Sequence, residues 1–180
     1  MKFNLPTWLC VVIALALVAF GLLFGTWSGY QEDRADVTAL LETENGLMDV
    51  LEYRAADGLN LCVVARRHLN AADPALLALE QSARALQQST DLAVRRTEDA
   101  KLTASVADVA EKLRASQSFT LSQRDQKYLD MLTADLSNLK GSTAVTVYNT
   151  AAQAFNQKLE GSLFGRLASV LGVGACPVYQ

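Results

Sequence analysis

A charge-free N-terminal segment constrains this chain more than any other feature of its sequence. No charged residue occurs between Lys2 and Glu32, and Leu9–Phe24 is almost wholly apolar. Trp8 and Trp27 flank the apolar part and would lie about 28 Å apart along a helix. This length is close to the ~30 Å hydrocarbon thickness of a bilayer, so the sequence predicts one transmembrane helix.

This segment fits either a cleaved signal peptide or an uncleaved anchor. The apolar run is longer than the h-region of a signal peptide, and the sequence Gly25–Ser28 is a poor substitute for an A-x-A cleavage site. Trp8, Trp27 and Tyr30 also occupy the positions where aromatic side chains prefer to lie, at the two membrane–water interfaces. We therefore expect residues 1–30 to remain as a single-pass N-terminal anchor.

Flanking charges predict the orientation of this anchor. Lys2 and the free amino terminus precede the apolar run, whereas Glu32, Asp33 and Arg34 follow it. Positive charge is retained on the cytoplasmic side of a membrane. The rest of the chain is accordingly expected outside the cytoplasm.

The remaining residues, 31–180, are acidic and have a helical composition. Without Lys2 the chain carries 15 Lys and Arg against 19 Asp and Glu, and this balance, with no basic stripe, argues against nucleic acid as a partner. Proline occurs only at Pro6, Pro74 and Pro177. A stretch of this length without proline, rich in Ala, Leu and Gln, favours an all-α domain.

Apolar residues at three- and four-residue intervals predict three long helices in this domain. The first ends near Leu69 and can continue directly from the anchor; the second opens at Asp73-Pro74, an N-cap followed by proline at the first helical position. The third runs from Leu121 to Phe155. Similar lengths and short connections favour an antiparallel up–down–up bundle. We expect Gly161–Gln180 to form a short fourth helix that folds back on this bundle; the alternative is an exposed apolar tail that docks on a partner.

The sequence offers no pattern of catalytic or metal-binding residues, and we expect no enzyme, cofactor or metal. The sole histidine, His68, has no H-E-x-x-H or C-x-x-C companion and is interpreted as a helix-end cation. The acidic residues are interpreted as charges on solvated helix faces: Glu98, Asp99, Asp130 and Asp135. Cys62 and Cys176 form either a disulfide or two buried thiols, and their spacing does not decide between these states.

Three glycines lie on one face of the expected anchor. Gly21, Gly25 and Gly29 follow one another at intervals of four residues, a double small-xxx-small pattern. Such a face lets two helix backbones approach closely within lipid, which favours self-association. The alternative is that glycine is frequent in membrane helices without any such role.

A pair of aromatic–asparagine dipeptides near the C-terminus is the strongest local motif. Tyr148-Asn149 is followed seven residues later by Phe155-Asn156, so the two dipeptides share one helix face. With Ala168, Gly172 and Cys176-Pro177-Val178-Tyr179 beyond it, the motif resembles the C-terminal signature of the LemA family, Y-N-x5-Y-N-x5-F-P-x4-A-x3-G-F followed by P-x-F. Further upstream, Arg54 and Asn60 fall at the spacing of that family's first long helix, whose hallmark is R-R-x-D-L-I-P-N-L-V.

This resemblance implies a protein of a bacterial membrane, with an N-terminal anchor before an antiparallel helical bundle at residues 31–180. It supplies no catalytic residues and implies a role in organising the membrane or envelope. The leading hypothesis is therefore a non-enzymatic, periplasmic scaffold or interaction module that self-associates or binds a membrane-protein partner. The alternative is an extracytoplasmic sensor domain that binds a small ligand or a partner between its helices, which requires a pocket with convergent polar groups.

Overall fold

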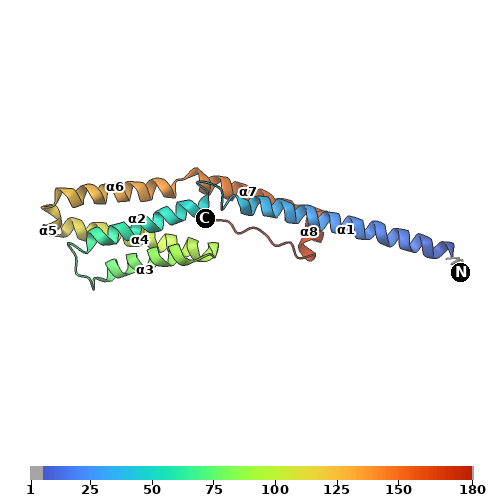
Figure 1. Ribbon diagram of the computed structural model, residues 1–180, viewed down its shortest axis with the longest axis horizontal. Coiled ribbons are helices and arrows are strands. Elements are labelled where there is room, and N and C mark those ends of the chain that lie inside the picture. Colours follow the sequence, from blue (N-terminus) through green and yellow to red (C-terminus); the bar gives the residue numbers. More distant parts are fainter. Residues whose placement is uncertain (1–5, 180) are drawn as a thin grey trace. The chain divides into compact units, whose positions relative to one another are not determined.

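The computed structural model describes residues 6–179, in which every regular element is a helix (Figure 1). The helices are α1 (Thr7–Ala39), α2 (Leu47–Ala65), α3 (Pro74–Gln88), α4 (Leu92–Ala115), α5 (Gln117–Thr120), α6 (Gln123–Lys140), α7 (Thr143–Gly161) and α8 (Leu163–Val170). The prediction of an all-helical chain is confirmed for this range. Lys2, on which the predicted orientation depends, lies outside the described residues.

Two compact units divide the chain. Unit 1 runs through Ala39 and resumes at Ala151–Cys176, and unit 2 comprises Leu40–Thr150 and the residues from Pro177 onward. Helix α7 begins in unit 2 and ends in unit 1.

The main element of unit 1 is the long apolar helix α1. It has 33 residues, and its most apolar 18-residue window has a mean hydropathy of 2.7 with none of the window buried. A helix of this length and composition can cross a bilayer, and both a membrane anchor and a signal sequence contain one. Helix α8 packs against α1 within the same unit.

Helix α2 is the centre of unit 2, since it contacts α3, α4 and α6 (Figure 1). Its inward face buries large apolar residues completely, and α3 and α4 add theirs: Leu47, Leu51, Leu61, Leu76, Leu79, Leu86 and Leu102. Gly58 allows these helices to approach closely, because a Cβ there would lie 2.7 Å from Leu102 Cδ1 and 3.2 Å from Ala83 Cβ. The helices of unit 2 thus form a packed bundle, as the apolar periodicity predicts.

The first expected helix is interrupted between α1 and α2. Helix α1 ends at Ala39, and α2 begins at Leu47. In the connection, Asn45 adopts a left-handed conformation with φ 58°, which asparagine tolerates better than most residues. A Cβ on Gly46 would lie 2.6 Å from the Thr43 carbonyl oxygen, so this turn requires glycine. The expectation of one continuous helix through to Leu69 is therefore wrong.

The second expected helix is a hairpin of two helices. Asp73 is the N-cap of α3, as predicted, and its carboxylate accepts a hydrogen bond from Ala75 N. Helix α3 ends at Gln88, however, and Asp91 caps α4 by accepting from Ala93 N and Val94 N. Helices α3 and α4 then pack against each other along their lengths (Figure 1).

The third expected helix is also divided, at Gly141 and Ser142 between α6 and α7. The short helix expected near the C-terminus is present as α8, whose N-cap Ser162 accepts a hydrogen bond from Gly165 N. Beyond α8, Gly172 adopts φ 95°, which is favourable only for glycine, and the chain continues without regular structure. This C-terminal tail, residues 172–179, contributes to both units.

Candidate functional site

A buried ion pair lies in the interior of unit 2. Arg54 on α2 donates from Nε to Asp99 Oδ1 on α4 at 2.5 Å, and the two side chains are 2% and 10% exposed. The other guanidinium nitrogens donate to Thr103 Oγ1 and to the Leu136 carbonyl oxygen. Each of the three guanidinium nitrogens thus donates one hydrogen bond, and α2, α4 and α6 are joined through one side chain.

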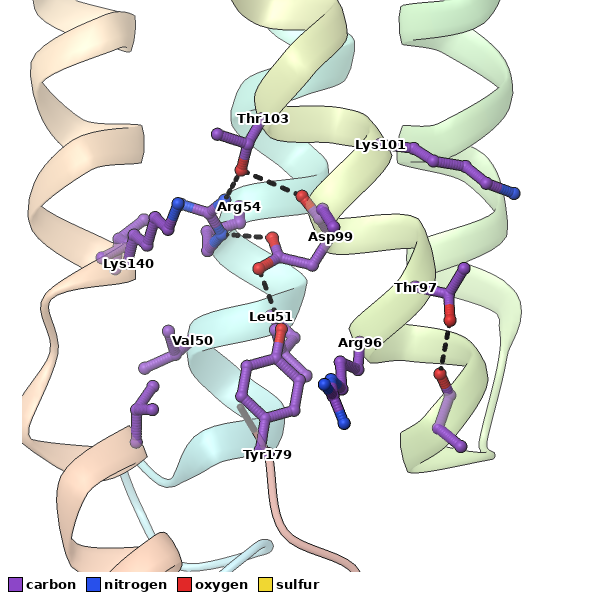
Figure 2. Close-up of a pocket in the computed structure, with 14 residues that line it drawn as sticks. Val50, Leu51, Arg54, Arg96, Thr97, Asp99, Lys101, Thr103, Lys140 and Tyr179 are labelled. Carbon is purple, nitrogen blue, oxygen red and sulfur yellow. Dashed lines mark hydrogen bonds and ion pairs between the residues drawn. The ribbon is translucent and has the colours of Figure 1, made fainter.

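The C-terminal tail completes this cluster. Tyr179 donates its phenolic hydrogen to Asp99 Oδ2 at 2.9 Å, as Figure 2 shows. Burial and the neighbouring Asp99 carboxylate hold the pKa of Tyr179 far above its usual range. The phenol therefore remains a neutral donor at physiological pH, and the Asp99 carboxylate accepts from both Arg54 and Tyr179.

A cavity of about 760 Å³ opens beside the cluster. Its apolar lining comes from α2, α4, α6 and α7: Val50, Leu51, Ala93, Ala100, Leu139 and Val145. Arg54, Asp99, Thr103 and Tyr179 supply polar groups, which already bond to one another. An apolar wall with a few fixed polar groups is typical of small-molecule pockets.

Positive charge borders this cavity. Arg96 and Lys140 line it, and the side chain of neither forms an ion pair or a hydrogen bond within residues 6–179. Lys101 also contributes to the lining, but it pairs with Glu98 at 2.7 Å and extends away from the cluster in Figure 2. The cations that remain available to a ligand are thus Arg96 and Lys140.

The two asparagines of the motif bind backbone of the C-terminal tail. In unit 2, Asn149 accepts from Tyr179 N at 2.7 Å and donates to Tyr179 O at 2.5 Å. In unit 1, Asn156 accepts from Cys176 N and donates to Cys176 O, both at 2.8 Å. Each side-chain amide therefore satisfies the backbone N–H and C=O of one tail residue, as a neighbouring strand would in a β-sheet.

The other residues of the motif have structural positions. Tyr148 is 1% exposed and donates to the Pro177 carbonyl oxygen at 2.7 Å, and Phe155 is buried in unit 1. Ala168 is fully buried on α8. Asn60 is exposed on α2, outside these contacts.

One prediction about a polar residue is wrong. Asp99 is 7% exposed and belongs to the buried cluster, not to a solvated face. His68 lies beyond the end of α2, and its Nε2 bonds with Asp125 Oδ2 at 2.8 Å while its ring packs edge-on against Phe119. Asp130 and Asp135 are exposed, as expected.

Cys62 and Cys176 are buried and free of a disulfide, which is one of the two states the sequence left open. Burial raises the pKa of Cys62 to about 11 and also raises that of Cys176. Within residues 6–179, no group of three or more His, Cys, Asp or Glu side chains is placed to hold a metal ion.

The predicted membrane residues lie along α1. Trp8 and Trp27 are 66% and 37% exposed, whereas Tyr30 is buried and hydrogen-bonds to Ser162 Oγ at 2.8 Å. A Cβ added at Gly21, Gly25 or Gly29 would meet no atom within 4 Å, so the glycine face is open. These glycines line a hollow of about 630 Å³ in unit 1.

Fold and sites together define an all-helical protein with a long N-terminal apolar helix, a helical bundle and a C-terminal tail held by side-chain amides. No protein-family model, curated protein or solved structure matches the chain.

Proposed function

We propose that this protein is a single-pass, membrane-anchored scaffold or interaction protein of LemA type, which self-associates and takes part in membrane or envelope organisation. The observation that carries the proposal is the uncovered apolar surface of α1. Large side chains along it are half to two-thirds exposed, including Leu15, Phe20 and Leu22 at 65%, 66% and 61%. An apolar surface of this extent requires a cover, and the apolar part of α1 between Trp8 and Trp27, about 28 Å long, matches the thickness of a lipid bilayer.

Self-association is supported by the open face at Gly21, Gly25 and Gly29. Close approach of two helices at such a face brings backbone atoms into van der Waals contact, which is the main attraction between helices in lipid. In the polar clusters around Arg54 and Asp125, the side chains form hydrogen bonds and ion pairs with one another and so hold helices together. This arrangement fits a structural role better than a catalytic one.

Crosslinking in native membranes tests the proposal, with a matched pair of variants. Gly25→Leu fills the glycine face, whereas Ala16→Leu adds similar bulk on the opposite side of the helix at ~100° per residue. We expect crosslinked dimers for the wild type and A16L, and several-fold fewer for G25L. Only monomers in the wild type, or equal dimer yields for G25L and A16L, would contradict self-association through this face.

The cavity in unit 2 supports a second candidate, a sensor domain for a small ligand. Arg96 and Lys140 beside apolar walls favour a small carboxylate with an apolar body. Benzoate should then raise the unfolding temperature of the full chain in nanodiscs, while uncharged benzyl alcohol should not. Replacing Arg96 and Lys140 by Ala should abolish this shift, and Lys127→Ala, an exposed change on α6, should preserve it. Equal shifts in all of these variants would exclude the cavity as the binding site.

A further inference from the structure

Helix α8 carries an apolar face that is largely exposed in the described part of unit 1. Leu163, Phe164 and Val170 are 85%, 60% and 84% exposed, and Leu171 next to the helix end is 38% exposed. On a helix of ~100° per residue, these residues occupy one continuous arc, with the partly buried Leu167 at its middle. The opposite face carries Gly165 and Ala168, both buried.

Contacts with α1 fix this helix beside the end of the apolar segment. Ser162, the N-cap of α8, hydrogen-bonds to the Tyr30 hydroxyl at 2.8 Å. Phe164 lines the same hollow as Gly25 and Gly29 of α1. Figure 1 shows α8 alongside α1, in agreement with the contacts between them. The apolar face of α8 therefore lies at the level of Gly25–Tyr30, where the uncharged segment ends.

This level is the one at which a bilayer interface is expected. Trp27 and Tyr30 are the aromatic residues of that end, and the first charges, Glu32 and Asp33, follow within one and a half turns. Short amphipathic helices with an apolar face and a flanking cation lie in the headgroup region with the apolar side chains in the acyl boundary. Arg166 is exposed at the edge of the apolar arc, where a cation can meet headgroup phosphates.

We propose that α8 is a second membrane contact, an interfacial helix that inserts Leu163, Phe164, Val170 and Leu171 into the leaflet from which α1 emerges. The proposal rests on the anchoring of α1 in the membrane and adds a partner, the lipid interface itself, for the C-terminal part of unit 1. A transmembrane helix with one contact can tilt and rotate freely. An interfacial helix bonded to it fixes the depth and the rotation of α1 at that interface.

Depth-dependent quenching of a fluorophore in the full chain tests this inference. One cysteine is introduced at Leu163, Leu121 or Phe20 and labelled with NBD in a Cys10→Ala background, in which the remaining Cys62 and Cys176 are buried. Mass spectrometry verifies the labelled site. Leu121 is the matched control, because it is a leucine of similar exposure, 79%, in unit 2. Circular dichroism checks that each exposed substitution leaves the helix content unchanged. The proteins are placed in vesicles of phosphatidylcholine and phosphatidylglycerol, with nitroxides at the headgroup, at acyl carbon 5 or at acyl carbon 12.

We expect the label at 163 to be quenched several-fold more than the label at 121, and most strongly by the shallow nitroxides. The label at 20 should be quenched most by the nitroxide at carbon 12. Quenching at 20 without quenching at 163 would overturn the interfacial helix and leave the anchor intact; blue-shifted emission at 163 in that case would indicate a protein partner. Absence of quenching at 20 would overturn the anchor, and the present inference with it.

Discussion

Arg54 shows how a buried charge can contribute little net stability and still be costly to remove. Its pair with Asp99 must offset the desolvation of both groups, which makes the pair weak evidence for stability as such. Its loss is a different matter, because an unpaired Asp99 would stay 7% exposed beside the Tyr179 hydroxyl. The guanidinium is best regarded as the group that fixes the register of α2 against α4.

Arg54→Met should therefore destabilise the protein by about 3–5 kcal/mol, the cost of breaking a buried pair on one side. The double variant R54M/D99L should recover most of that loss, since no buried charge remains. Thermal and urea unfolding of the full chain in detergent, followed by circular dichroism, measures both values.

The surface pair Arg84–Glu80 provides the control for this comparison. Arg84 is 57% exposed at its side chain, so Arg84→Met should cost ~1 kcal/mol or less. Equal effects of R54M and R84M would mean that the Arg54 cluster is not buried as described.

Asp125 gives the protein an acid-sensitive contact. The hydrogen bond from His68, together with those from Ser122 and Arg67, holds the pKa of Asp125 below its usual value. A carboxylate with a lowered folded-state pKa stabilises the fold above its unfolded pKa of about 3.9, and this stability is lost as the pH falls through the lower folded-state value. Asp125→Asn should thus show a smaller fall in melting temperature than the wild type as the pH is lowered from about 5 through the unfolded pKa and below it. Asp130→Asn, at an exposed position, should follow the wild-type curve.

At the scale of elements, apolar periodicity predicts helices well but not all of their ends. Asp73-Pro74 marks the start of α3 because the cap and the fixed proline φ act locally. The turn at Ser89–Asp91 escapes this reasoning, since Leu86, Thr90, Ala93 and Thr97 keep three- and four-residue spacing across it. Asp91 is itself a good N-cap, and this signal could have identified the turn.

Which residues form the buried cluster around Arg54 depends on tertiary contacts. The spacing of residues along the sequence does not reveal these contacts. Arg54 is expected on the family resemblance, but its partner Asp99 is 45 residues away on another helix. A local clue exists: Asp99 lies seven residues after Leu92 and three before Leu102, on the buried side of α4. Tyr179 could not be found this way, because its position follows from the course of an irregular tail.

The spacing of the two asparagines has a geometric explanation. Seven residues advance about 10.5 Å along a helix, and three residues advance about 10 Å along an extended chain. Amides at Asn149 and Asn156 can therefore each serve one residue of a tail segment, Tyr179 and Cys176. The sequence predicts amides that flank a core seam, and the structure identifies the backbone groups that they satisfy.

Asn149→Ala and Asn156→Ala should each loosen the tail, because a backbone N–H and C=O lose their partners at a cost of about 1–3 kcal/mol per group. Carboxypeptidase digestion of the full chain should then remove C-terminal residues several-fold faster than in the wild type. Gln153→Ala is the control, since Gln153 is exposed on the same helix between the two asparagines. Unchanged digestion of both asparagine variants would show that other contacts hold the tail.

At the scale of the whole molecule, the fate of α1 determines which proposals can hold. Self-association through the glycine face and membrane insertion of α8 both require α1 to stay in lipid. Each proposal depends on residues that a signal peptidase would remove or expose. Helix α1 continues without interruption from Thr7 through Trp27 to Ala39, so Gly25–Ser28 is helical and lies between the apolar segment and the bond from Tyr30 to Ser162.

We therefore expect the protein to keep its N-terminal segment in cells. Intact-mass spectrometry of the membrane fraction should find a chain of about 19.5 kDa that resists carbonate extraction. A secreted reporter from the same cells, with its signal peptide removed, controls for active processing. A soluble chain that begins near residue 28 would contradict the anchor, because the apolar window that carries the proposal would then be absent from the mature protein. In that case Trp27 and the exposed side chains of α1 before it would belong to a targeting signal, and the cavity beside Arg96 and Lys140 would remain the structural basis for a function.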